Sequence, residues 1–466
     1  MVKCINLLTL LGTTLMMSGS TFAKYYNEKD ILKETGWKGL GVMENAPNHL
    51  SILSQGRYDE SKGKYDTNFY FPKSAGKDID IFVFDIGFNF TYNDFVNTNE
   101  RKIECSIVIK DGEVFEEHSK ACYSKTILDH GTWAAATSAG MVNGIASRAN
   151  IYGAVRYNTE NYLDPAIDLL AFLKYVKDNL FRKGKAVFNL SVEFYYAKED
   201  FEKNETIKEI QKLINEMSSQ GAVFIASAGN DNSDTGFVSY SEKFLTDNPA
   251  YAFFMGKSIL PCNLDNVICV GGVANMDLEY AGISYTNPPP YSDDMKSSNY
   301  QFRNNDMGSN YGPQVDLYAP FDIHYTGSSK HLSYYFNRAV VKYFDTSYDI
   351  VDLGNGVEYI ENFDALLSGT SFSAPLTSGV AAAIMSEFPK ERFNSTSMLQ
   401  YLVAISQKDI IKDLPDGSYN YFLNIGKTSL YTPEDEDDSD DDEEVVISDL
   451  ENLKEVDDES DSDDEQ

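Results

Sequence analysis

The sequence predicts an α/β fold in which a central, mostly parallel sheet is flanked by helices on both faces. Short runs of β-branched and aromatic residues alternate along the chain with helical segments, which is the pattern of strand–helix–strand units. Polar side chains directly follow several of these runs, where the functional groups of open α/β sheets gather. An acidic segment with few apolar residues follows the last predicted element, and we expect it to be disordered.

The chain of 466 residues carries a net charge of −33, much of it at the C-terminal end. Residues 431–466 contain 20 acidic residues against the single Lys454, so we predict a disordered acidic tail. An acidic chain is repelled by nucleic acid and by anionic membranes, and we expect neither as a partner. Loose Ca²⁺ binding by the tail is weakly supported, because no regular ligand spacing repeats there.

The N-terminal residues 1–23 have the pattern of a signal peptide. Lys3 precedes an apolar run over residues 4–17, and Thr21 and Ala23 suit a cleavage site, which gives a mature start at Lys24. The run is too short to span a bilayer, and no later segment approaches the ~18 apolar residues that a membrane span needs. We therefore expect a secreted, extracellular protein without a membrane span.

The following residues divide into a leading segment and one domain. Residues 24–75 are polar, rich in tyrosine and weakly periodic, and we expect them to wrap around a domain. Strands and helices alternate from residue 76 to residue 430, which we assign to a single domain. Within it, the stretch from Asn275 to Phe363 is rich in Tyr, Asn, Asp and Pro, and we expect surface elaboration with short strands.

Four cysteines remain once Cys4 is removed with the signal peptide. An even number suits disulfides in an oxidising compartment. The near-neighbour pairing, Cys105–Cys122 and Cys262–Cys269, is one of three connectivities and is the one we favour. We expect Cys105 and Cys122 to lie in a loop that follows Asp85-Ile-Gly. No CxxC pair or histidine cluster accompanies these residues, which argues against metal binding.

Polar residues stand where predicted strands end and predicted helices begin. The run over residues 78–84 is a buried-strand pattern that ends at Asp85. His130 opens a helix of small residues, and Ser371 precedes a nearly all-apolar helix with Pro375 in its first turn. A serine at such a helix start lies beside free N–H groups that favour an oxyanion. An ordinary capping serine has the same local pattern, so the remainder of the chain must decide.

A reactive serine needs a base to take its proton and an acid to orient that base. Asp85, His130 and Ser371 supply these groups in the chain order Asp…His…Ser, which is also the order in subtilisin. Asn230 follows a predicted strand over residues 222–226 and could supply an amide for the oxyanion. The sequence thus predicts acyl transfer through a Ser–His–Asp triad.

Together these motifs resemble the subtilisin family of serine peptidases, nearest its proteinase K-like branch, over residues 45–430. The resemblance rests on blocks that occur in family order: Asp85-Ile-Gly, His130-Gly-Thr, Gly144-Ile-Ala, Asn189-Leu-Ser191, Ser227-Ala-Gly-Asn230, Val267-Ile-Cys-Val-Gly-Gly272, Ser309-Asn-Tyr-Gly312, Val315-Asp-Leu-Tyr-Ala-Pro320 and Gly369-Thr-Ser-Phe-Ser-Ala-Pro375. It implies that Asp85 orients His130 and that His130 is the general base. By the same resemblance Ser371 is the nucleophile and Asn230 stabilises the oxyanion.

The resemblance also implies where a peptide substrate binds. One segment is formed by Ser191, Val192 and Glu193, and a second is formed by Ser227, Ala228 and Gly229. We expect a monomer that acts on protein or peptide substrates and requires no cofactor. Structural calcium is compatible with the resemblance, but the sequence assigns no ligands to it.

Several residues depart from the family pattern. Ile86 stands where Thr or Ser usually follows the triad aspartate, and Leu376 replaces the usual His after the motif proline. Glu193 replaces a glycine beside P1, the residue on the acyl side of the cleaved bond. Its carboxylate can block the pocket, attract a basic P1 residue or turn outward without effect, and we favour attraction. Only residues 24–44 remain for a folding prodomain, so they are a degenerate propeptide or the protein folds unaided.

The leading hypothesis is a secreted serine endopeptidase that works through an acyl-enzyme. The alternative is a catalytically impaired protein with the subtilase fold that still binds peptides, as Ile86 and Glu193 suggest. A third hypothesis places the function in the acidic tail, as an interaction or Ca²⁺-buffering segment.

Overall fold

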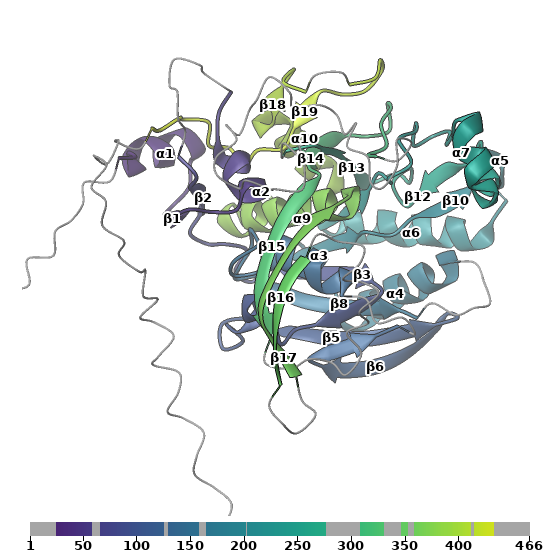
Figure 1. Ribbon diagram of the computed structural model, residues 1–466, viewed down its shortest axis with the longest axis horizontal. Helices are drawn as coiled ribbons and strands as arrows, with labels where there is room; N and C mark the ends of the chain where they lie inside the picture. The colour runs from purple at the N-terminus through teal and green to yellow at the C-terminus, as the bar shows by residue number, and fades with distance from the viewer. Residues whose placement is uncertain are drawn as a thin grey trace, which may run out of the picture. The chain divides into compact units, whose positions relative to one another are not determined.

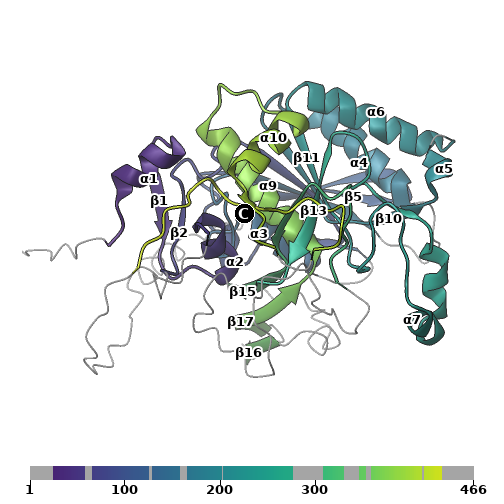
Figure 2. The same cartoon turned by 90° about the horizontal axis from the view of Figure 1, so that it is seen from above.

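The computed structural model describes residues 25–57, 66–124, 129–157, 165–201, 203–275, 308–329, 346–352, 358–411 and 414–432. The predicted signal peptide and the acidic residues from Pro433 onward lie outside these ranges. The described residues belong to one compact unit, which ends at Thr432. Two perpendicular views show its sheet with the helices around it (Figures 1 and 2).

Within the described residues the core is a ten-stranded sheet. Its strand order is β18 (Gln407–Lys408), β19 (Tyr421–Phe422), β14 (Leu317–Pro320), β13 (Val267–Val273), β11 (Ala222–Ser227), β9 (Ala186–Leu190), β3 (Asp80–Asp85), β8 (Asn150–Arg156), β5 (Ile103–Lys110) and β6 (Glu113–Ser119). All neighbours from β19 to β5 pair in parallel, and antiparallel pairing occurs only at the edges, between β18 and β19 and between β5 and β6. The predicted mostly parallel sheet is confirmed.

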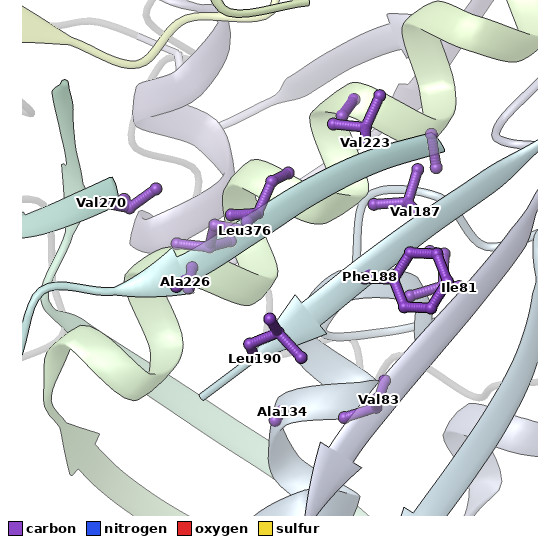
Figure 3. Close-up of a cluster of buried hydrophobic side chains, with 14 of the residues drawn as sticks. Ile81, Val83, Ala134, Val187, Phe188, Leu190, Val223, Ala226, Val270 and Leu376 are labelled. Carbon is purple, nitrogen blue, oxygen red and sulfur yellow. The ribbon is translucent and has the colours of Figure 1, made fainter. Parts of the chain in front are cut away.

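Helices cover both faces of this sheet, as predicted (Figure 2). Helices α3 (His130–Ala139) and α9 (Thr370–Glu387) pack together on one face, and α4 (Pro165–Asn179) and α6 (Glu205–Ser219) pack together on the other. Leu376 of α9 and Ala134 of α3 belong to the buried cluster formed with the central strands (Figure 3). Leu376 therefore packs in the hydrophobic core.

The alternation of side chains along the central strands separates the two faces. Phe84 stacks on Phe172 of α4, and Phe188 stacks on Phe224 in the neighbouring strand, so these rings fill the α4 and α6 side. Asp85 is offset by one residue from Phe84, and its side chain points toward α3 on the other face. The strand period thus places the predicted triad aspartate on the helix face that carries His130.

The N-terminal residues pack against the C-terminal part of the domain. They form α1 (Glu28–Thr35), β1 (Leu40–Met43), α2 (Asn48–Ser51), η1 (Ile52–Ser54) and β2 (Phe69–Pro72). The Ile425 N–H donates to the Leu53 carbonyl at 2.8 Å, and the Thr428 N–H donates to the Glu34 carboxylate at 2.8 Å. The Lys427 ammonium lies 4.2 Å from the ring centroid of Tyr70. These contacts fasten the leading segment to the end of the domain.

The region after β3 contains more strands than we predicted. Cys105 lies in β5 and Cys122 in β7 (Ala121–Tyr123), which pairs with β4 (Gly87–Asn89), where we expected a loop. Similarly, β14 joins the central sheet, and β15 (Asp322–Ser329), β16 (Thr346–Asp352) and β17 (Glu358–Ser368) form a separate antiparallel sheet. The expectation of surface elaboration was wrong for β14, which is buried in the central sheet, and residues 276–307, 330–345 and 353–357 lie outside the described ranges.

Both predicted disulfides are present, Cys105–Cys122 and Cys262–Cys269. The remaining elements are η3 (Asn93–Phe95), β10 (Phe194–Tyr196), α5 (Lys198–Phe201), α7 (Glu242–Asp247), η4 (Pro249–Phe254), β12 (Ser258–Leu260) and α10 (Ser395–Ile405). No helix in the described ranges is long and apolar enough to cross a membrane.

Candidate active site

Asp85 and His130 meet where β3 ends and α3 begins. His130 Nδ1 lies 2.8 Å from Asp85 Oδ1 and 2.9 Å from Asp85 Oδ2. Gly131 allows this approach, because a Cβ there would lie 2.9 Å from the Asp85 Cβ and 2.5 Å from the Gly87 carbonyl oxygen. The lack of a side chain at Gly131, in the His-Gly-Thr motif, therefore lets the start of α3 lie against the end of β3.

The Asp85 carboxylate is buried and has a second donor besides the imidazole. The Ile86 backbone N–H donates to Asp85 Oδ1 at 2.7 Å. A hydrogen bond from a backbone N–H to a carboxylate oxygen is charge-assisted and holds the carboxylate in place. The backbone N–H of Ile86 thus provides a hydrogen bond to Asp85, although the Ile86 side chain has no hydroxyl to offer.

The environment of His130 favours its protonated form. Burial alone would lower the pKa of the imidazole, but the Asp85 charge and hydrogen bond, together with the Glu193 charge, raise it above 6.5. A hydrogen bond from Nδ1–H to Asp85 leaves Nε2 as the acceptor when the ring is neutral. The ring is therefore oriented to take a proton at Nε2.

Ser371 lies in the first turn of α9, which packs beside α3. The ring of the next residue, Phe372, has its centroid 5.6 Å from that of the His130 imidazole. The helix begins at Thr370 with Gly369 as its N-cap residue, at φ 143°, and no side chain caps it. Ser371 is thus not a capping serine, and Pro375 lies inside the helix rather than in its first turn as we predicted.

Asn230 is fixed to the start of α9 through its amide oxygen. Asn230 Oδ1 accepts from the Thr370 N–H at 2.9 Å and from Thr370 Oγ1 at 3.2 Å. The preceding Gly229 has φ 97°, and its N–H donates to Thr370 Oγ1 at 3.1 Å. With the oxygen occupied, the NH₂ group remains available to an acceptor in the site.

The two predicted substrate-binding segments leave neighbouring parallel strands. β9 pairs with β11, with Leu190 opposite Ala226, so residues 191–193 and 227–229 emerge side by side. Ser191 Oγ donates to the Ser371 carbonyl at 2.9 Å, which joins the first segment to α9. The structure thus brings these segments to the edge of the sheet that carries Asp85, since all follow the carboxyl ends of parallel strands.

The individual residues of these segments differ in exposure. Val192 is buried, as are Ser227, Ala228 and Gly229. The Ala228 N–H donates to the Val270 carbonyl at 2.9 Å, which extends the parallel pairing of β11 with β13. A Cβ at Gly229 would lie 2.4 Å from Asn310 Nδ2, so a side chain does not fit there.

Glu193 points into the site and not outward to solvent. Its Oε2 accepts from the Tyr195 hydroxyl at 2.8 Å, and its Oε1 accepts from Asn230 Nδ2 at 3.4 Å. Burial and the Asp231 charge raise the pKa of Glu193 to about 7, although the Tyr195 hydrogen bond and His130 act in the opposite direction. The predicted oxyanion donor therefore has a carboxylate as its partner.

Sequence reasoning missed three residues that shape this site: Asp231, Tyr195 and Asn310. Asn310 Nδ2 donates to the Ala228 carbonyl at 2.9 Å, and its Oδ1 accepts from the Asp231 and Ser233 N–H groups at 3.0 and 2.9 Å. Asn310 thereby holds the segment that carries Asn230. It belongs to the Ser309–Gly312 motif, so that motif was the available signal.

Structural calcium, which the sequence left open, has no candidate ligand cluster among the described residues. In the described part of the chain, no group of three His, Cys, Asp or Glu side chains is arranged to hold a metal ion. The functional groups of the candidate site are carboxylates, an imidazole, hydroxyls and amides.

Comparison with known proteins identifies the family. The sequence profile of the Subtilase family, peptidase family S8, matches residues 76–423. The subtilisin-like serine protease Pen ch 18 of Penicillium rubens is 26% identical over 217 residues, which cover 45% of this chain and 38% of that protein. Alkaline protease 1 of Aspergillus flavus is 26% identical over 203 residues, 43% of either protein. The matched stretches thus span less than half the length of these relatives.

Solved structures also match most of the chain. A cold-adapted subtilisin-like serine proteinase has a TM-score of 0.46 and 17% identity, covering 82% of this chain and 98% of its own. A protease of Pseudoalteromonas arctica has a TM-score of 0.49 and 16% identity, with the same coverage. Because the family profile covers most of the sequence, the chain belongs to the subtilase family.

Proposed function

We propose that the protein is a secreted serine endopeptidase in which Ser371 is the nucleophile, His130 the general base and Asp85 the residue that orients it. The observation that carries the proposal is the hydrogen bond of 2.8 Å between His130 Nδ1 and Asp85, on the helix that packs against the start of α9. It leaves Nε2 to accept the serine proton. Family membership supports the same assignment.

The proposed reaction proceeds through a covalent acyl-enzyme. Ser371 Oγ attacks the scissile carbonyl carbon while its proton passes to His130 Nε2. The tetrahedral oxyanion is stabilised by Asn230 Nδ2 and by N–H groups at the start of α9. His130 then gives its proton to the leaving amine, the acyl-enzyme forms, and a water molecule that His130 activates releases the second product.

Positioning of the substrate would come from the segments 191–193 and 227–229. An extended peptide that adds as a strand gains main-chain hydrogen bonds, and its P1 side chain then lies between the two segments. Protein and peptide chains are accordingly the proposed substrates. The disulfides support an oxidising, extracellular location.

The decisive experiment is labelling of the secreted protein with a serine-directed fluorophosphonate, followed by mapping of the labelled peptide. We expect modification of Ser371 and loss of labelling and of turnover in Ser371→Ala. The melting temperature of that variant should stay within ~2 °C of the wild type, because only a half-exposed hydroxyl is removed. Labelling at another serine, or equal turnover by Ser371→Ala, would contradict the proposal.

One observation favours the second candidate, a peptide-binding protein with impaired catalysis. The Glu193 carboxylate is hydrogen-bonded to the Asn230 amide that the reaction requires. If this contact persists with substrate bound, the anion opposes the charge that develops on the oxyanion. In that case the protein would bind extended peptides, and neither labelling nor turnover would be observed.

A further inference from the structure

Two carboxylates beside the predicted substrate segments share one tyrosine hydroxyl. The Tyr195 hydroxyl lies 2.8 Å from Glu193 Oε2 and 3.1 Å from Asp231 Oδ2. A phenol has one proton and can donate it to only one of these oxygens at a time. Glu193 follows β9 and Asp231 follows β11, so the pair spans the ends of the two strands that lead into the substrate segments.

The side-chain donors that contact the pair are all neutral. Asp231 also accepts from the Tyr240 hydroxyl and from Asn310 Nδ2, the latter at 3.2 Å. Glu193 accepts from Tyr195 and, at 3.4 Å, from Asn230. In the residues that the structure describes, no lysine or arginine forms an ion pair with Glu193 or Asp231. His130 interacts electrostatically with Glu193 but makes no hydrogen bond to either carboxylate that we observe, and closely spaced carboxylates without a lysine or arginine partner favour the binding of a cation.

We propose that Glu193 and Asp231 bind the cationic side chain of a P1 lysine or arginine, and that this cation frees the Asn230 amide for the oxyanion. The inference rests on the proposed function and specifies its substrate class. A lysine ammonium or an arginine guanidinium offers several donors, which match the oxygen atoms of the pair. The hydroxyl of Tyr195 and that of Tyr240 then keep Asp231 in place.

The release of Asn230 follows from how the amide is held. Its oxygen is tied to the Thr370 N–H at 2.9 Å, so the amide plane stays fixed when the Glu193 contact is lost. Without a cation, the Glu193 carboxylate competes for Nδ2 and repels the oxyanion that forms beside it. A P1 cation attracts the carboxylate and neutralises it. A basic P1 residue should therefore raise kcat as well as lower KM, because the gain is largest in the transition state.

The turnover test compares peptide amides that carry lysine or norleucine at P1, since norleucine has the same chain without the charge. For the wild type we expect a roughly 10- to 100-fold preference for lysine in kcat/KM, the range for a hydrogen-bonded charge. Glu193→Gln should reduce this preference to a few-fold at most and raise kcat on the norleucine peptide. Asp231→Asn should also reduce the preference. Glu199→Gln, which removes an exposed carboxylate outside the site, should retain wild-type values.

A binding test separates this inference from the proposed function. In a Ser371→Ala background, fluorescence anisotropy gives the Kd of the same two peptides without cleavage. We expect tighter binding of the lysine peptide by about 10-fold, and loss of the difference on adding Glu193→Gln. Circular dichroism and melting temperature show whether each variant is folded. Should Asp231→Asn fail to fold, Glu193→Gln alone decides.

The outcomes are distinct. Selective binding of the lysine peptide, without labelling or turnover by the wild type, would support cation binding by Glu193 and Asp231 and would contradict the proposed peptidase activity. Labelling of Ser371, with equal Kd and equal kcat/KM for both peptides, would support the peptidase proposal and contradict cation binding by Glu193 and Asp231. A lysine preference that Glu193→Gln leaves unchanged would also overturn it.

Discussion

Ser191 and Ser371 are joined by a hydrogen bond of 2.9 Å in which the Ser191 hydroxyl donates to the Ser371 carbonyl. In an uninterrupted α-helix that carbonyl would accept from the backbone N–H four residues later, but this position is Pro375, which has none. The hydroxyl at the end of β9 therefore replaces a helix hydrogen bond in the first turns of α9. It also ties a proposed substrate-binding segment to the proposed nucleophile.

This relationship predicts a coupling between Ser191 and Pro375. Ser191→Ala should cost about 1 kcal/mol of unfolding free energy, because a carbonyl loses its donor. In a Pro375→Ala background the restored backbone N–H can reach the same carbonyl, so Ser191→Ala should cost clearly less there. Urea unfolding of the wild type, both single variants and the double variant measures the difference. An identical cost in both backgrounds would show that the hydroxyl does not replace the helix bond.

The Asp85–His130 contact predicts the acid limb of the activity profile. His130 must be neutral to act as a base, and its pKa lies above 6.5 because of Asp85, so kcat should fall as pH drops through a value above 6.5. Asp85→Asn removes the charge that raises this pKa. We expect kcat to fall by about 10³- to 10⁴-fold and the acid limb of the remaining activity to move to lower pH. The measurement is kcat against pH for both proteins.

Glu193 also raises the pKa of His130, and its own ionisation falls in the same pH range. The profile of Glu193→Gln is therefore the necessary control for the Asp85 variant. If the limb belongs to His130, it should persist in Glu193→Gln at a somewhat lower pH. Disappearance of the limb in this variant would assign it to Glu193 instead.

Asp322 predicts a second, structural dependence on pH. Its side chain is buried, Oδ1 accepts from Ser368 Oγ at 2.6 Å, and Oδ2 has no partner among the described residues. Burial raises the pKa of Asp322 from 3.8 to about 7, so the folded state holds a proton that the unfolded chain releases. Between these two values stability must fall as pH rises, because the unfolded state binds fewer protons there.

Asp322→Asn should remove that loss. Relative to the wild type, the variant should gain roughly 3 kcal/mol of unfolding free energy between pH 4.5 and pH 8, given about 1.4 kcal/mol per pKa unit. Urea unfolding at both pH values gives the difference directly. A constant difference between variant and wild type at the two pH values would mean that Asp322 is not the titrating group.

The proposed triad could be predicted from sequence because each residue lies at an element boundary with a local signature. Asp85 follows a continuous apolar run, and His130 and Ser371 open helices of small residues. The carboxyl ends of parallel strands lie at one edge of the sheet, so the three local signatures together predicted that these residues lie in one site. The contact between His130 and Asp85 agrees with that reasoning.

Other parts of the site depended on contacts that no local pattern encodes. Asp231 meets Tyr195 only because β9 and β11 are adjacent, and Asn310 reaches Ala228 across 82 positions. One prediction was wrong although the local pattern was informative. Before the turn-forming pair Asp111-Gly112, apolar residues alternate as in a half-buried strand, at Ile103, Cys105, Ile107 and Ile109. That signal for the β5–β6 hairpin was present, but we predicted a loop there.

The two disulfides predict different losses of stability because they close loops of different length. Cys105 and Cys122 are 17 residues apart, and Cys262 and Cys269 are 7 apart. In the chain-entropy model these loops correspond to about 3 and about 2 kcal/mol. Since all four cysteines are buried, replacing either pair by alanine removes similar packing. We therefore expect the Cys105→Ala/Cys122→Ala variant to unfold at a lower urea concentration than Cys262→Ala/Cys269→Ala. Equal midpoints, or a larger loss for the short loop, would show that loop closure does not determine the contribution of these bonds.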